Sequence, residues 1–132
     1  MKEIHRYSKR NAKEGIGTNL RMSPETYALR RKVIALIHEA KGLVPTLPRI
    51  EIRITDEGTK GYCGFAYMSS CCIFITEGAC KYSEASLRHV VFHELVHAVA
   101  GFGHDEKCPL MKSIHSLEEP NSQKVIYQAF LN

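Results

Sequence analysis

Residues 87–104 read LRHVVFHELVHAVAGFGH, and this stretch decides what the rest of the chain must pack around. Ser83 can cap the first turn of a helix, and Gly101 suits the position just after a last turn. We therefore expect one helix from about residue 84 to residue 100. His93 and His97 are four positions apart, so a helix places them one turn above each other on the same face. The apolar residues around them predict that the opposite face of the helix is buried.

His93, Glu94 and His97 form the pattern H-E-x-x-H. Two imidazoles at this spacing can bind one tetrahedral metal ion. Glu94 would project beside the metal, where it could take a proton from metal-bound water and later pass it to a leaving amine. These residue types predict one Zn²⁺ per chain, with Glu94 as the general base. His89 lies one turn before His93 and is expected to be a polar residue at the rim of a cleft.

A catalytic zinc ion commonly has three protein ligands and one open position, so a third ligand is expected. His104 is the favoured candidate, because the helix stops at Gly101 and the chain can then turn back toward the metal. Asp105 is an alternative, since carboxylates also bind zinc. More distant candidates, which would imply a different architecture, are His115, Glu118 and Glu119.

The whole chain, residues 1–132, predicts a single α+β domain. Ser23 and Pro24 are suited to begin a helix, and Gly42 is suited to end it. The elements expected after this helix are a half-buried strand at residues 49–55, a glycine-containing edge strand at 61–68, a turn at Ser69-Ser70, a buried strand at 71–76, the histidine helix, an irregular stretch at 105–120 and a last helix at 122–130.

The net charge of +4 is concentrated toward the start of the chain. Residues 1–32 contain nine Lys or Arg residues and three Glu residues. We expect residues 1–20 to form a flexible basic arm. Residues 1–32 could make a weak contact with nucleic acid or another polyanion, although a solvated arm followed by the outer face of a helix explains the same charges.

No apolar run is long enough to span a bilayer, and the first residues lack the apolar core of a secretory signal. These features predict a cytoplasmic protein without a membrane segment. The chain has five cysteines and no C-x-x-C pair. We therefore expect reduced cysteines, with neither a disulfide framework nor a zinc cluster.

The histidine stretch resembles the signature of the metzincin clan of zinc peptidases, H-E-x-x-H-x-x-G-x-x-H followed by a turn that contains methionine. In this likeness Gly101 is the turn glycine, His104 the third zinc ligand and Met111 the residue of the Met-turn. The chain has one residue more than the family pattern between His97 and Gly101, so the helix or its turn must be one residue longer. The resemblance covers about residues 50–130.

The resemblance implies a minimal metzincin- or zincin-like domain. In such a domain a small mixed sheet packs on a backing helix and on the active-site helix, and a C-terminal helix follows the Met-turn. It also implies a zinc metallopeptidase that hydrolyses a peptide or protein substrate. An edge strand binds that substrate as an added β-strand in the family, so Gly64, Phe65 and Ala66 would border the cleft.

Three other interpretations remain open at this point. A hydrolase could keep the same metal and act on an amide other than a peptide. A SprT-like zinc peptidase also has H-E-x-x-H and a later histidine, in which case His115 would be the third ligand. A zinc-stabilised binding module with a basic arm would need no catalysis. Glu94 has little purpose in a purely structural zinc site, and this favours an enzyme.

Overall fold

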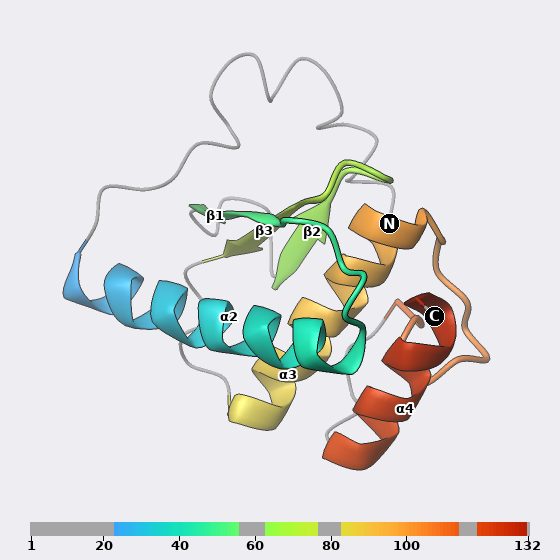
Figure 1. The fold of residues 1–132 in the computed structure, drawn as a ribbon. Helices are drawn as coiled ribbons and strands as arrows, with labels where there is room; N and C mark the ends of the chain where they lie inside the picture. The colour runs from blue at the N-terminus through green and yellow to red at the C-terminus, as the bar shows by residue number, and fades with distance from the viewer. Residues whose placement is uncertain (1–22, 56–62, 77–82, 114–118, 132) are drawn as a thin grey trace.

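The computed structural model describes residues 23–55, 63–76, 83–113 and 119–131. These residues form a mixed α+β fold with three helices and a small mixed sheet, which confirms the α+β class that the sequence predicts (Figure 1). The elements are α2 (Pro24–Leu43), β1 (Glu51–Thr55), β2 (Gly64–Ala66), β3 (Cys72–Thr76), α3 (Glu84–Leu95), a π-helical turn η3 (Val96–Ala100) that continues α3, and α4 (Pro120–Leu131).

The three strands of the described sheet lie in the order β1-β3-β2. β1 pairs with β3 in parallel, and β2 pairs with β3 in the antiparallel direction. β2 therefore lies at an edge, as the sequence predicts. The expected start of β3 at Cys71 is wrong by one residue, because Cys71 has a left-handed φ of 56° and the strand begins at Cys72.

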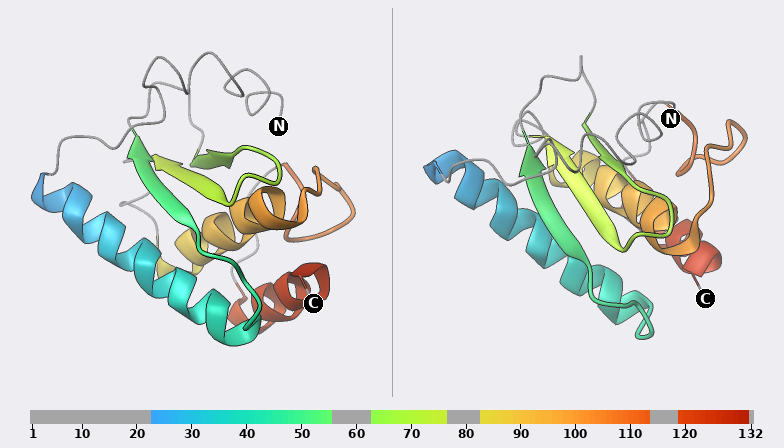
Figure 2. Two further views of the ribbon diagram at one scale, coloured as in Figure 1. Left: turned by 45° about the horizontal axis from the view of Figure 1, so that its top comes forward. Right: turned by 90° about the horizontal axis from the view of Figure 1, so that it is seen from above.

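The helices lie on one side of the sheet, and α4 packs against α3 and η3 (Figures 1 and 2). The alternation of side chains along β3 separates the two faces. Ile73 and Ile75 join the main core between sheet and helices. Phe74 lies on the other face, where its ring stacks on Phe65 at a centroid distance of 4.6 Å.

α2 is the backing helix. Ser23 caps it by accepting a hydrogen bond from the backbone N–H of Thr26, and Pro24 occupies its first turn, both as predicted. The expected end at Gly42 is wrong: the helix continues to Leu43, and the N–H of Val44 closes it on the carbonyl of Ala40. Val44 is 1% exposed, so core packing rather than a glycine stop decides where α2 ends.

Arg88 ties α3 to α2. Its guanidinium donates to both carboxylate oxygens of Glu39, at 2.7 and 3.1 Å, and to Glu84 at 3.2 Å. The hydrogen bonds to Glu39 raise the pKa of Arg88 above its ordinary value. A two-pronged contact of this kind fixes orientation as well as distance. The ion pair therefore holds α3 at a set angle on α2.

None of the helices in the described parts of the chain combines the length and the apolar character that crossing a bilayer would require.

Candidate metal site

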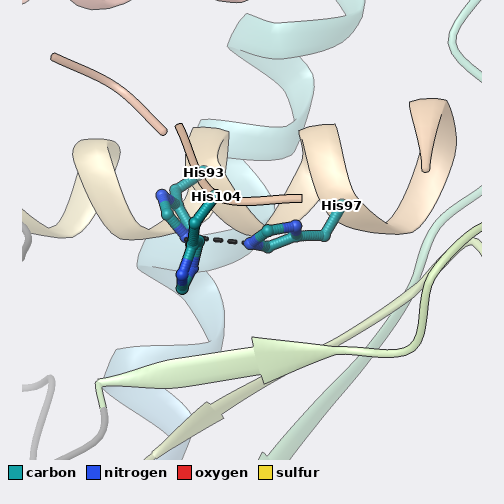
Figure 3. A group of neighbouring side chains, drawn as sticks. All are labelled: His93, His97 and His104. Carbon is teal, nitrogen blue, oxygen red and sulfur yellow. Dashed lines mark hydrogen bonds between the residues drawn. The ribbon is translucent and has the colours of Figure 1, made fainter. Parts of the chain in front are cut away.

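His93, His97 and His104 converge on one point (Figure 3). The Nε2 atom of His93 lies 3.0 Å from Nε2 of His97 and 3.1 Å from Nε2 of His104. Four-residue spacing on the helix places the first two, and the turn after the helix returns the third. His93 and His97 are fully buried and His104 is partly buried. The three side chains lie close enough together to hold a metal ion.

Two backbone carbonyls orient the buried rings. Nδ1 of His93 donates to the carbonyl of Leu110 at 2.8 Å, and Nδ1 of His97 donates to the carbonyl of Phe102 at 2.6 Å. A neutral imidazole that donates from Nδ1 has a bare lone pair on Nε2. Such hydrogen bonds set the tautomer in which histidine binds a metal.

This donor set fits a cation. Burial lowers the pKa of His97 to about 4, so its ring is neutral at ordinary pH. The neutral His97 directs its Nε2 lone pair toward Nε2 of His93, 3.0 Å away, and a cation between the two nitrogens would accept such a lone pair. A zinc ion about 2.0–2.1 Å from each nitrogen would hold tetrahedral nitrogens roughly 3.3 Å apart. The observed spacing is within a few tenths of an ångström of that value.

Glu94 is fully buried, and neither of its carboxylate oxygens has a hydrogen-bond partner among the described residues. Burial raises its pKa well above the ordinary value. A buried carboxyl group without partners costs stability, and such costs are typically found at functional sites. A water molecule on a metal held by the histidines would provide the missing partner.

The π-helical turn η3 was not expected from the sequence. The N–H of Gly101 reaches the carbonyl of Val96, five residues back, and also that of His97, both at 3.1 Å. A π-turn takes one residue more than an α-turn, and such turns are frequent at functional sites. Gly101 then ends the helix with a left-handed φ of 74°. The extra residue between His97 and Gly101 was the signal for this feature.

The segment after His104 closes on itself beside the histidines. The N–H of Asp105 donates to the carbonyl of Met111 at 2.9 Å, and the N–H of Met111 donates to the carbonyl of Cys108 at 3.1 Å. Met111 is fully buried in the main core. This turn delivers the Leu110 carbonyl to His93, so the predicted Met-turn segment supports the site through its backbone.

The two other candidate ligands that the structure describes, Asp105 and Glu119, do not join the three histidines. The exposed carboxylate of Asp105 accepts from the N–H of Lys107 within its own turn. Glu119 accepts from the N–H groups of Asn121 and Ser122 and so caps the start of α4. His115 and Glu118 lie outside the described residues.

Two predictions about the surroundings can be compared with the structure. His89 is 1% exposed, so the expectation that it lies at a cleft rim is wrong. All residues of α3 from Leu87 to Leu95 are buried, and His89 lies among them inside the protein. Gly64, Phe65 and Ala66 form the edge strand β2, and all three are buried. Their role along a substrate cleft stays a prediction.

Comparison of the chain with known protein families, curated proteins and solved structures found no match.

The turn after the helix offers a matched pair of glycine substitutions. Gly101→Ala should lower the free energy of unfolding by about 1–2 kcal/mol, because alanine resists a positive φ. Its Cβ would also meet Ser69 Oγ at 2.6 Å. Gly103→Ala has nothing within 4 Å and should change stability by less than about 0.5 kcal/mol. Urea denaturation of both variants measures the difference, and equal effects would contradict this account of the turn.

Proposed function

We propose that this chain is a zinc-dependent metallopeptidase with a metzincin-like active site. The observation that carries the proposal is the convergence of three histidine side chains on one point, with Glu94 next to His93 in the same helix, buried and without a hydrogen-bond partner among the described residues. His93, His97 and His104 would hold the ion. Three protein ligands are the number that catalytic zinc sites commonly have.

Zinc, when bound, lowers the pKa of a coordinated water to about 7 and polarises a substrate carbonyl. Glu94 would accept a proton from the attacking water on a carboxylate oxygen and would transfer it to the nitrogen of the departing amine. The position of Glu94 favours this role, because it is a carboxyl group next to His93 in the same helix and is buried within the protein.

The resemblance to metzincins supports a peptide substrate over other amides. The glycine turn after the second histidine and the buried Met111 occupy the order that the family pattern implies. The edge position of β2 agrees with a substrate strand bound alongside it. A SprT-like arrangement would instead use His115, which lies outside the described residues.

A binding module is the alternative of a different class, with residues 1–32 gripping a polyanion. Only residues 23–32 of that stretch are described. A structural zinc site gains nothing from a buried, unpartnered carboxyl group beside its ligands, so Glu94 favours catalysis.

The ligand set is tested by metal content. Wild-type protein purified without added zinc should contain about one zinc ion per chain, and His104→Ala should lose most of it, because two histidines alone bind zinc far more weakly. Asp105→Ala is the matched control, since Asp105 is the next residue and its carboxylate points into its own turn. Elemental analysis measures all three proteins.

Retention of zinc in His104→Ala together with its loss in His115→Ala would replace the three-histidine site by the SprT-like one. Wild-type protein that binds no zinc even after reconstitution would rule out the metallopeptidase. Hydrolysis of a mixed peptide library by the zinc-loaded wild type, and by no ligand variant, is the result expected of the proposed enzyme.

A further inference from the structure

The turn between β2 and β3 contacts the last turn of the histidine helix. The N–H of Ser69 donates to the carbonyl of His97 at 3.1 Å, and the N–H of Cys71 donates to the carbonyl of Ala98 at 3.0 Å. The last carbonyls of a helix lack partners within the helix. Figure 2 shows this connection beside the orange end of the helix. The turn therefore caps η3 from outside.

Both donors have an unusual backbone conformation. Ser69 and Cys71 each have a φ of 56°, and they are the only described residues other than glycine with a positive φ. A left-handed conformation costs such a residue roughly 1–2 kcal/mol. Two of them within three residues indicate that something holds the turn in this shape, and backbone strain of this kind clusters at functional sites.

The residue between them locks the turn. The hydroxyl of Ser70 donates to the carbonyl of Tyr67 at 2.7 Å and accepts from the N–H of Cys72 at 3.2 Å. On the far side, the carbonyl of Cys71 accepts from the N–H of Glu51 at 2.9 Å, which connects the turn to β1. The turn is thus fixed to the sheet, and the backbone N–H groups of Ser69 and Cys71 point toward η3.

The contacts reach the metal site through the backbone of a ligand. The carbonyl that Ser69 holds belongs to His97, and the same carbonyl also accepts from the N–H of Gly101, where the chain turns toward His104. A shift of this carbonyl would move His97 and the start of the turn that carries His104. The position of two of the three nitrogens therefore depends on the sheet turn.

We propose that Ser69 and Cys71 are positioning residues of the metal site: their backbone amides fix the π-helical turn in the geometry that lets His97 and His104 share one ion. This inference rests on the proposed zinc site. It adds that the sheet, and not the helix alone, sets the affinity and the coordination geometry of the ion.

The experiment compares three substitutions of Ser69 by zinc titration against a competing chelator and by the visible absorption spectrum of the cobalt(II)-loaded protein. Ser69→Pro removes the N–H and excludes a positive φ. It should weaken zinc binding by about 10–100-fold, as loss of an outer support typically does, and should alter the cobalt spectrum. Ser69→Gly keeps the N–H and accepts the positive φ, so it should retain the affinity and spectrum of the wild type.

Ser69→Val covers the case in which the proline variant does not fold. Valine keeps the N–H but strongly resists a positive φ, so zinc binding should fall between that of the glycine and proline variants. Leu47→Ala controls for stability alone, because Leu47 is 2% exposed and packs in the core beyond the end of α2. It should lower stability without changing the cobalt spectrum.

Wild-type zinc affinity and an unchanged cobalt spectrum in both Ser69→Pro and Ser69→Val would overturn this inference and leave the zinc site standing. Loss of affinity in Leu47→Ala equal to that in Ser69→Val would also overturn it, since general destabilisation would then explain the effect. Wild-type protein that binds neither zinc nor cobalt would overturn the proposed function itself and, with it, the positioning role.

Discussion

Glu94→Gln should reduce peptide hydrolysis by at least about a hundredfold while the protein keeps its zinc. The amide cannot accept a proton from water, and general acid–base groups contribute about 10²–10⁴-fold to rate. The three histidines are untouched, so metal content stays that of the wild type. The measurement is the hydrolysis rate of a peptide substrate with elemental analysis of the same sample. His104→Ala, in which rate and zinc fall together, is the contrasting control.

The same substitution should make the metal-free protein more stable. Burial raises the pKa of Glu94 well above 4.5, so the folded state keeps a proton that the unfolded chain releases as the pH rises. The stability of the metal-free wild type should therefore decline above about pH 4.5, up to the raised pKa, and Glu94→Gln should lack that decline. At pH 8 the variant should gain about 1–3 kcal/mol in urea denaturation after chelation.

A hydrolysis rate of Glu94→Gln within threefold of the wild type would contradict the role of Glu94 as the proton carrier. An unchanged urea midpoint of the metal-free variant would show that the folded protein accommodates the ionised carboxylate. The two readouts are independent, because one concerns turnover with zinc and the other concerns folding without it.

His97 should make the metal-free protein sensitive to acid. Its pKa falls from 6.5 to about 4 through burial, so the unfolded chain binds a proton in this range that the folded state excludes. The free energy of unfolding is therefore unaffected by the protonation of His97 above pH 6.5. It declines as the pH falls toward 4, by up to about 3 kcal/mol. Urea denaturation of chelated protein between pH 7 and pH 4 measures the decline.

His97→Asn should flatten this decline, because no imidazole remains at the buried position. His38→Asn is the control, since it makes the same substitution at an exposed histidine on α2. A decline of equal size in His97→Asn and the wild type would assign the acid sensitivity to other groups.

Much of the fold follows from local signals in the sequence. Ser23 and Ser83 begin α2 and α3 as their capping chemistry predicts, and the strand predicted from the period-two alternation at residues 49–55 is found as β1, which begins two residues later at Glu51. His93 and His97 are neighbours through helix geometry alone. These features depend on residues at most four positions apart, and for that reason a single sequence reveals them.

Features that depend on distant contacts were missed. Gly42 does not end α2, since the packing of Val44 carries the helix further. The positive φ of Cys71 depends on hydrogen bonds to Glu51 and to Ala98, neither of which is near it in sequence. The glycine turn made it possible to favour His104 as the third residue of the site. No feature of the sequence predicted that the carbonyl of Leu110 orients His93.

The two carbonyls that orient His93 and His97 belong to the main chain, and this has an evolutionary consequence. The side chains of Phe102 and Leu110 can change without removing a backbone oxygen. Mutational drift at these positions therefore leaves the ring orientation intact, provided that the spacing of the chain is kept. Natural variants should thus tolerate substitution of the half-exposed Phe102 far better than insertion or deletion between His97 and Met111, whereas the buried Leu110 should accept only apolar residues of similar size.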